Sequence, residues 1–344
     1  MATYALRDTT EIGDYLRPYI VAEVNTSHNG NMDVVFQMIS KAAEIGCNCV
    51  KFQSWSAQSL YSRTYYDSNP IAKRIVSKFS LTEDELLKAA YFCKEQKIAF
   101  ASTPYSKVEV DFLVEKCEVP YIKVASMDLN NYPFLEYIAR TDMPVVLATG
   151  MGTMEEIHRA VDVFEKAGNN KLCILHCVSV YPAEASKIQL NNILGLRDAF
   201  PGYPIGFSDH SIGIEIPTAA VALGSAMIEK HFTLDNKKVG MDNQMATEPA
   251  EMERLIKSCH KVYEALGERQ RILLEEELEQ RAKMRRSVVA ARDLKAGEIL
   301  KEIDMDVKRP GTGYPPEKIK DLTGKILKKD ICSDTILSEE DVMI

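Results

Sequence analysis

Short hydrophobic runs alternate with amphipathic stretches along most of the chain, up to residue 268. Between the runs, hydrophobic residues at helical spacing predict helices, among them 31–46, 82–96 and 153–168. The hydrophobic runs themselves have the length and composition of buried strands. They lie at 19–25, 48–53, 98–103, 121–126, 144–149, 172–177, 204–208 and 226–232.

Eight strand–helix units of this kind, over roughly 250 residues, predict a (β/α)8 TIM barrel within residues 1–268. A helical pattern at 250–268 closes the barrel. An open, doubly wound sheet is the alternative, but it usually shows a glycine-rich turn after its first strand. The residues that follow the first strand here, EVNTSHNGN, contain no GxGxxG.

The chain changes character after residue 268. Residues 269–286 are dense in charge, which predicts a solvated linker that is helical in part. Residues 287–344 contain short β-like runs separated by Gly and Pro and no long helical pattern. They predict a separate, small β-rich domain of about 60 residues.

Composition narrows the classes of function. Of the 344 residues, 46% are hydrophobic, as in ordinary globular proteins. A net charge of −8 gives no electrostatic basis for binding nucleic acid or an anionic membrane. The eight cysteines form no CxxC pair and mostly lie in hydrophobic runs, so we expect buried free thiols. Because the sequence shows neither a signal-peptide pattern nor a long apolar run, we expect a cytoplasmic protein.

Polar residues stand at the end of every predicted strand. The functional residues of a TIM barrel collect at the carboxyl ends of its strands, so these positions are the candidates for a site. They include Glu23, Asn25, Lys51, Gln53, Ser102, Thr103, Lys123, Ser126, Thr149, His176, Ser208, Asp209, His210, Glu229, Lys230 and His231.

Two lysines among these hydroxyl-bearing residues favour an anionic substrate, most simply a phosphate. The alternative is that Lys51 and Lys123 point outward or form internal ion pairs with Glu23. His210 and His231 end consecutive strands, which lie about 5 Å apart in a barrel. Two imidazoles there suit either an open divalent-metal site or general acid–base roles. His28 and His176 are poorer candidates.

The motifs at the strand ends occur in an order that resembles the sialic acid (nonulosonic acid) synthase family, which includes N-acetylneuraminate synthase. In the tail, VKRPGTG at 307–313 is similar to the antifreeze-like (SAF) domain that those enzymes carry. The barrel motifs that carry the resemblance are IVAEVNTSHNGN, VKFQ, ASTPYS, IKVAS, LATGM, LHCVSVYPA, IGFSDHS and IEKHFTLD.

The resemblance implies an enzyme that condenses phosphoenolpyruvate with an open-chain N-acylmannosamine-type sugar. The products are a nine-carbon 2-keto-3-deoxy acid and phosphate. It also implies that His210 and His231 hold Mn2+, or Mg2+ or Co2+ in its place, which polarises the sugar aldehyde. Glu23 matches a carboxylate that handles protons or orients water.

The resemblance further implies the substrate contacts. Tyr181 and Asp242 match sugar-contacting positions. Arg309 matches an arginine that extends from the SAF domain over the barrel of a partner, which implies a domain-swapped homodimer with the segment 269–286 as the exchanging arm. The positions that match the phosphoenolpyruvate site are Lys51, Thr103, Lys123, Ser126 and Ser208.

Two positions depart from the family's pattern. Ala148 stands where a Ser is frequent, and Ser179 stands where members that make N-acetylneuraminate often carry Asn. A legionaminate or pseudaminate synthase that uses a diacetamido-trideoxyhexose therefore stays open, as does a 6-phosphate on the sugar. A metal-dependent aldolase is a further alternative.

Overall fold

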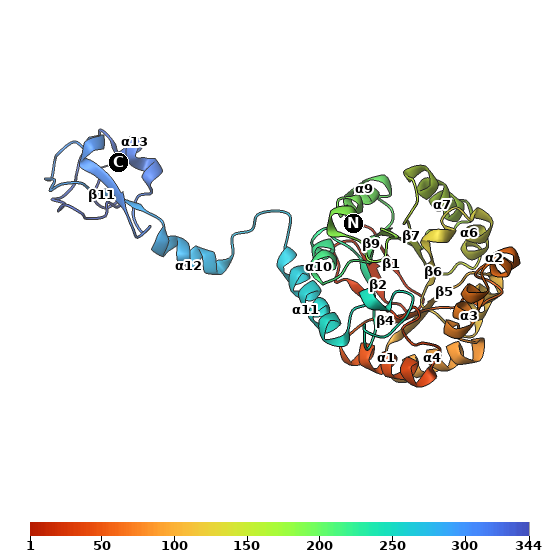
Figure 1. The fold of residues 1–344 in the computed structure, drawn as a ribbon. Coiled ribbons are helices and arrows are strands. Elements are labelled where there is room, and N and C mark those ends of the chain that lie inside the picture. The colour runs from red at the N-terminus through yellow and green to blue at the C-terminus, as the bar shows by residue number, and fades with distance from the viewer. Residues whose placement is uncertain (344) are drawn as a thin grey trace. The chain divides into compact units, whose positions relative to one another are not determined.

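The computed structural model describes residues 1–343, and its larger part is a barrel of parallel strands surrounded by helices (Figure 1). The sheet has eight strands in the order β5-β4-β3-β10-β9-β8-β7-β6, and β5 lies against β6 to close it. The predicted TIM barrel is confirmed and the open sheet is excluded. The strands are β3 (Tyr19–Glu23), β4 (Cys49–Gln53), β5 (Ala99–Thr103), β6 (Ile122–Val124), β7 (Val145–Ala148), β8 (Leu172–Cys177), β9 (Ile205–Asp209) and β10 (Met227–His231).

Every barrel strand is buried on both faces, which is why its sequence is a continuous hydrophobic run. Side chains such as Ile20 and Phe207 belong to the layer packed under the helices. Alternate side chains, such as Val21 and Leu175, fill the lower part of the barrel interior. The interior is closed from below by the N-terminal hairpin of β1 (Thr3–Ala5) and β2 (Glu11–Gly13). Leu6, directly after β1, and Ile12 within β2 join that inner cluster.

The helices of the barrel begin at residues that the sequence marks clearly. The side chains of Thr82 and Thr153 each accept a hydrogen bond from the N–H of a Glu three residues later, and that Glu's carboxylate accepts one from the Thr N–H, so both form capping boxes. The barrel helices are α1 (Met32–Glu44), α2 (Arg63–Ser68), α3 (Pro70–Phe79), α4 (Glu83–Glu95), α5 (Lys107–Glu115), α6 (Tyr132–Ala139), α7 (Met154–Lys166), α8 (Ala185–Ile188), α9 (Asn192–Ala199), α10 (Glu215–Ala222) and α11 (Pro249–Leu266).

Residues 54–82 carry two helices that the hydrophobic pattern did not assign. Helices α2 and α3 pack a small cluster of their own around Trp55, Tyr66 and Phe79. Because this cluster adjoins the end of β4, it supports the loop that carries Trp55 and Tyr61 to the top of the barrel.

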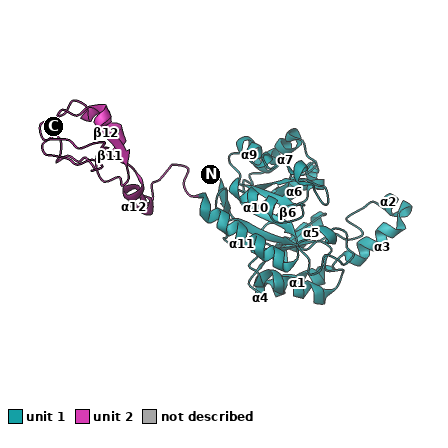
Figure 2. Ribbon diagram, turned by 60° about the vertical axis from the view of Figure 1, so that its left-hand side comes forward, with its two compact units in different colours: residues 1–266 teal, residues 267–344 magenta. Residues whose placement is uncertain are grey.

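The chain divides into two compact units, Met1–Leu266 and Gly267–Ile344 (Figure 2). The second unit has its own hydrophobic core, which includes Val288, Leu300 and Leu337. Its regular elements are α12 (Glu275–Met284), β11 (Ser287–Ala290), β12 (Met305–Lys308) and α13 (Ile319–Leu322). Most of the predicted linker is thus the helix α12, whose Ala282 carbonyl accepts a hydrogen bond from the Gly311 N–H at 2.8 Å.

No helix within residues 1–343 is both long and apolar enough to cross a membrane. All eight cysteines are free thiols, and seven of them are buried, as the sequence predicted; Cys332 is exposed.

Candidate active site

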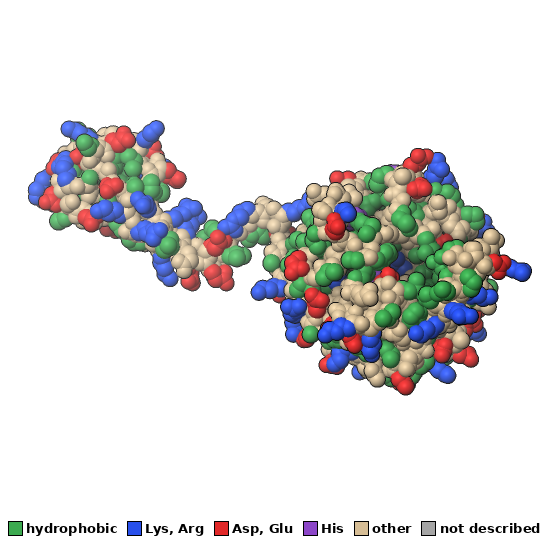
Figure 3. Space-filling model, viewed as in Figure 1, with side chains coloured by type: hydrophobic (Ala, Val, Ile, Leu, Met, Phe, Trp, Pro, Cys, Tyr) green, Lys and Arg blue, Asp and Glu red, His purple; other side chains and the backbone are tan. Residues whose placement is uncertain are grey.

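A cavity of about 360 Å3 opens at the carboxyl ends of the barrel strands. Figure 3 looks into this face and shows a hollow at its centre with hydrophobic side chains around it. Every barrel residue that the sequence singled out for substrate or metal lines this one cavity: Glu23, Lys51, Thr103, Lys123, Ser126, Tyr181, Ser208, His210, His231 and Asp242. Arg309 belongs to the second unit, where it is exposed.

The floor of the cavity is a network of buried charges. Lys51 forms an ion pair with Glu23 and lies 3.7 Å from Glu229. Lys123 approaches Glu229 from the other side, also at 3.7 Å. The parallel register explains the first pair, because Lys51 and Glu23 are direct neighbours on β4 and β3. The two hypotheses for Lys51, an internal ion pair and a place in an anion-binding site, are therefore compatible. Lys51 is paired with Glu23 and also lines the cavity.

Hydroxyl groups complete this floor. The Lys51 Nζ donates to Thr103 Oγ1 at 3.1 Å, and Ser208 Oγ donates to Glu229 Oε1 at 2.9 Å. Two ammonium groups with nearby hydroxyls form an anion-binding surface. Here the carboxylates of Glu23 and Glu229 neutralise part of the positive charge of the two lysines. An anion that enters has to compete with, or displace, the contacts to Glu229.

Burial and the neighbouring lysine charges have opposite effects on the pKa values of the two carboxylates in this network. Burial raises the pKa of Glu23, and the charge of Lys51 only partly opposes this. Burial would also raise the pKa of Glu229, but Lys123 and Lys51 together outweigh it and lower that pKa. Burial lowers the pKa of Lys123. Two carboxylates in one cavity whose pKa values are driven apart are the pattern expected of an acid–base pair.

Gln53 is held in one amide orientation beside Glu23. Its Oε1 accepts hydrogen bonds from Trp55 Nε1 at 2.6 Å and from the Tyr105 hydroxyl at 3.3 Å. Its Nε2 must therefore face Glu23, to whose Oε1 it donates at 3.1 Å. The sequence placed Gln53 at a strand end, but it gave no sign that Trp55 and Tyr105 orient it.

The two histidines lie on the same wall, with ring centroids 5.4 Å apart and the Tyr181 ring 4.2 Å from that of His210. His210 Nδ1 lies 2.8 Å from the Val178 carbonyl and is thus the protonated nitrogen, which leaves Nε2 as a ligand. Burial lowers the pKa of His231 well below its usual range, so this imidazole is neutral and able to ligate. Residues 1–343 contain no cluster of three His, Cys, Asp or Glu suited to a metal ion. The two imidazoles on one wall of the cavity are the donor set that an open site with two protein ligands needs.

Strand alternation separates Asp209 from its neighbours Ser208 and His210. Asp209 points away from the cavity, where it accepts from Lys230 Nζ at 2.6 Å and from Ser211 Oγ at 2.7 Å. Lys230 Nζ also donates to the Ser211 carbonyl at 2.7 Å. This buried pair fixes the loop after β9 and hence the direction of His210.

Loops that follow the strands also line the cavity. Asn25 donates to Asp242 Oδ2 at 2.5 Å, which ties the loop after β3 to the loop after β10. The Gly150 N–H donates to Ser126 Oγ at 3.0 Å, and a Cβ at Gly150 would clash with Ser179 Oγ. A larger residue at this position would have to displace the hydroxyls of Ser126 and Ser179.

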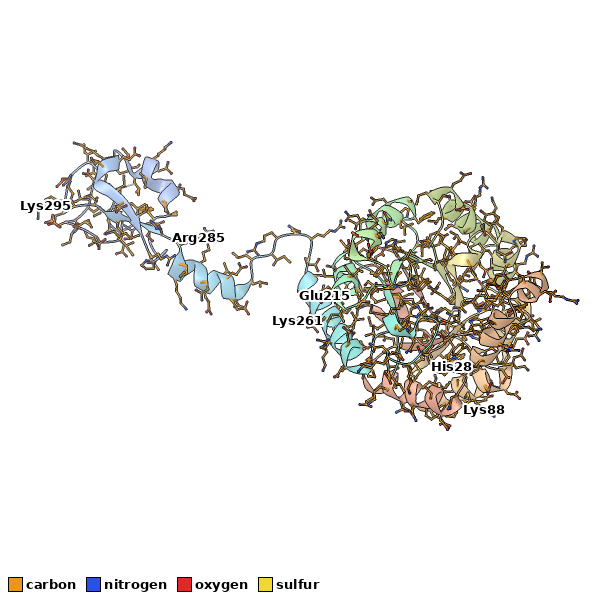
Figure 4. The ribbon with its side chains drawn as sticks, viewed as in Figure 1. His28, Lys88, Glu215, Lys261, Arg285 and Lys295 are labelled. Atoms are coloured by element: carbon orange, nitrogen blue, oxygen red, sulfur yellow. The ribbon has the colours of Figure 1, made fainter. Side chains whose placement is uncertain are left out.

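His28 and His176, which are the poorer candidates from the sequence, do not line the cavity. His176 Nε2 lies 2.6 Å from the Ile188 carbonyl. His28 Nδ1 accepts a hydrogen bond from the Gly30 N–H at 3.0 Å, and burial lowers its pKa to about 4. Figure 4 labels His28, together with charged residues of the outer helices such as Lys88 on α4 and Lys261 on α11.

Comparison with known proteins identifies the family of the chain. Residues 38–271 match the sequence model of the NeuB family, and residues 285–343 match that of the SAF domain. The chain belongs to the NeuB family. A relative from Legionella pneumophila, N,N'-diacetyllegionaminic acid synthase, is 32% identical, with 96% of each chain covered. The N-acetylneuraminate-9-phosphate synthase of Homo sapiens is 34% identical over 94% of this chain and 92% of that protein.

A solved structure is similar over most of this NeuB-family chain. The N-acetylneuraminic acid (sialic acid) synthetase from Leptospira borgpetersenii superposes with a TM-score of 0.75 at 31% identity. The superposition covers 81% of this chain and 94% of the synthetase chain. The relatives named here are sialic and legionaminic acid synthases, so the chain is a member of a nonulosonic acid synthase family.

Glu229 and Cys177 line the NeuB-family cavity beside the predicted residues but were not among the predicted site residues. Glu229 was recognised only as a polar strand end, although it lies two residues before His231 and therefore faces the same side of β10. That alternation was the signal that could have found it. Cys177 also lines the cavity, with its Sγ 3.9 Å from His210 Nδ1. Its apolar sequence context gave no such signal.

Proposed function

We propose that this protein condenses phosphoenolpyruvate with an N-acylmannosamine-type sugar to give a nine-carbon 2-keto-3-deoxy acid and phosphate. The observation that carries the proposal is the pair of buried lysines, Lys51 and Lys123, beside hydroxyls on the floor of a NeuB-family barrel. In this reaction, carbon 3 of phosphoenolpyruvate bonds to the aldehyde carbon. Water adds at carbon 2, and phosphate leaves by cleavage of its C–O bond.

Lys51 and Lys123 bind the phosphate and carboxylate of phosphoenolpyruvate in this proposal, with Thr103, Ser126 and Ser208 as hydroxyl donors. The lysines are already desolvated and held by carboxylates, so they need little reorganisation when the anion arrives. Glu229 holds the two ammonium groups apart before binding, at 3.7 Å from each.

Glu23 is proposed to handle the proton of the attacking water. Its raised pKa brings it nearer to neutrality, where a carboxylate can both accept and return a proton. The Gln53 amide, fixed by Trp55 and Tyr105, keeps one Glu23 oxygen in a constant position. Tyr181 and Asp242 are proposed to contact the sugar.

His210 and His231 are proposed to hold a divalent ion, Mn2+ with Mg2+ or Co2+ as alternatives. When bound, such an ion supplies Lewis-acid polarisation of the sugar aldehyde. The role of the chain is to present two imidazoles on one wall: that of His231, whose pKa burial lowers, and that of His210, whose Nδ1 is fixed by the Val178 carbonyl.

We expect phosphate release to require both substrates. Purified protein with Mn2+ should release phosphate from phosphoenolpyruvate only when an N-acylated mannosamine is present, because the aldehyde is the electrophile that carbon 3 attacks. Phosphate would be measured colorimetrically and the nine-carbon product by mass spectrometry. Aldol products formed without phosphoenolpyruvate would instead assign the barrel to another class of enzyme.

We also propose that the protein acts as a domain-swapped homodimer in which Arg309 of one chain completes the site of its partner. Truncation after Gln280 should then leave a folded barrel, because residues 1–266 form a compact unit with a separate core. Turnover should fall at least a hundredfold, the scale for loss of a charged group that contacts the substrate. Circular dichroism and sedimentation would report fold and assembly.

The full-length Arg309→Ala variant is the companion to that truncation. It should lose turnover to a similar extent while it keeps the dimer, since Arg309 is an exposed residue and not part of the second unit's core. Normal turnover in either variant would remove Arg309 from the site.

A further inference from the structure

The first turn of α5 contains a buried carboxylate that the proposed reaction does not use. Glu109 is only 8% exposed, and it is not part of the active-site lining. Burial raises the pKa of its carboxyl group, and hydrogen bonds from Ser59, Tyr105 and Ser106 oppose this rise. A buried carboxylate costs free energy unless hydrogen bonds compensate for its lost hydration. The groups that donate to Glu109 therefore indicate what it does.

The hydrogen bonds of Glu109 extend beyond those of an ordinary helix cap. In α4 and α7, the Glu at the third helical position accepts from the N–H of the Thr cap residue. In α5, the Ser106 hydroxyl accepts from the Glu109 N–H at 3.3 Å, but the Glu109 carboxylate reaches past Ser106 to the Tyr105 N–H at 2.6 Å. Glu109 thus fixes the loop after β5 as well as the start of its own helix.

The same carboxylate holds the loop after β4. Ser59, in that loop, donates to Glu109, and the two residues line one small cavity together. Ser59 Oγ also accepts a hydrogen bond from the Ser56 N–H at 2.9 Å, directly after Trp55 in the chain. Two loops that are far apart in the sequence therefore meet at one carboxylate.

These two loops carry the donors that orient the Gln53 amide. Trp55 Nε1, at 2.6 Å, and the Tyr105 hydroxyl, at 3.3 Å, both donate to Gln53 Oε1. An indole N–H can only donate, and burial raises the pKa of Tyr105 well above its usual range, so its hydroxyl stays protonated. Gln53 Nε2 is then left to donate to Glu23 Oε1 at 3.1 Å.

We infer that Glu109 is a positioning residue for the Gln53 amide. By holding both donor loops, it keeps Gln53 Nε2 on one oxygen of Glu23 and so keeps that carboxylate in one orientation. The kinetic consequence rests on the proposed function, in which Glu23 handles a proton. Because Glu109 does not line the active-site cavity, it should affect kcat and not the binding of either substrate.

Glu109→Ala is expected to lower kcat about tenfold, the scale for a slightly misplaced reacting group. KM for phosphoenolpyruvate and for the sugar should each change less than about twofold. Glu109→Gln should restore most of the rate, because an amide oxygen can still accept from the Tyr105 N–H. Glu156→Ala is the matched control, since Glu156 has the same helical position in α7 and bonds only to the cap residue there. It should leave kcat unchanged.

A double-mutant cycle distinguishes positioning from a general loosening of the barrel. In Gln53→Ala the oriented amide is already absent, so the addition of Glu109→Ala should lower kcat less than about twofold further. A general structural effect would instead lower kcat by the same factor in both backgrounds. Equal losses in the two backgrounds would overturn the inference.

Trp55 provides a readout that does not depend on turnover, because it is the only tryptophan in the sequence. Protein labelled with 15N-tryptophan gives one indole signal, and the hydrogen exchange of that N–H reports its bond to Gln53. We expect exchange at least about tenfold faster in Glu109→Ala, and unchanged exchange in Glu109→Gln and Glu156→Ala.

The two measurements separate this inference from the proposed function. Unchanged indole exchange in Glu109→Ala, or equally faster exchange in Glu156→Ala, would overturn the positioning role even if turnover fell. If the unaltered protein releases no phosphate with any N-acylated mannosamine, the proposed function falls. The exchange rates would still decide whether Glu109 holds the two loops.

Discussion

His210→Ala is expected to lower turnover at least a thousandfold while the barrel stays folded. A thousandfold loss corresponds to about 4 kcal/mol of transition-state stabilisation, the scale of a lost Lewis-acid contact. The fold should survive because the side chain's polar contacts are few, a hydrogen bond to the Val178 carbonyl at 2.8 Å and a long contact with Cys177 Sγ at 3.9 Å. Its loss costs about 1 kcal/mol, or a decrease in Tm of about 2–4 °C.

A metal readout separates this role from general acid–base catalysis. Calorimetric titration with Mn2+ should show at least tenfold weaker binding to both His210→Ala and His231→Ala. His158→Gln is a suitable control, since His158 lies exposed on α7 and should keep both turnover and Mn2+ affinity. Full Mn2+ affinity in both histidine variants, with turnover lost, would assign them to proton transfer and remove the metal from the site.

Lys51→Met is expected to abolish turnover and to destabilise the protein markedly. The substitution leaves the buried carboxylates of Glu23 and Glu229 with Lys123 as the only cation of the network. Removal of one partner from a buried pair costs about 3–5 kcal/mol, which predicts a decrease in Tm of about 10 °C or more. Differential scanning calorimetry and the phosphate-release assay would measure the two effects.

The double variant Lys51→Met/Glu23→Gln separates stability from catalysis. Because it also removes the uncompensated carboxylate, it should recover most of the lost Tm but none of the turnover. Lys257→Met removes a lysine from an exposed pair with Glu253, and there the cost should stay below about 1 kcal/mol. Lys51→Met with near-normal turnover would mean that this lysine does not bind substrate.

Much of the barrel could be predicted from the sequence because its determinants are local. The run at 172–177 is continuous and apolar because β8 is buried on both faces, and the T-x-x-E patterns at Thr82 and Thr153 became capping boxes. The helices α2 and α3 were missed, since their few hydrophobic residues pack in a small separate cluster around Trp55 and not on the main core.

The sequence was sufficient to predict where the candidate site lies and which strand-end residues belong to it. Barrel topology brings all strand ends to one face, so residues as distant as Glu23 and His231 become direct neighbours in register. The contacts between those residues were not predictable. Whether Lys51 would pair internally or face the cavity was left as an alternative, and only the register with β3 and the position of Glu229 show that it does both.

By itself, the sequence determined the alternation of strands and helices, the change of character near residue 268, and the polar residues at each strand end. These follow from periodicity and composition, which act over a few residues. Only the tertiary structure decided the orientation of the Gln53 amide and the contact between Asn25 and Asp242. Both depend on loops that are far apart in the chain and meet only when the barrel closes, so no local pattern encodes them.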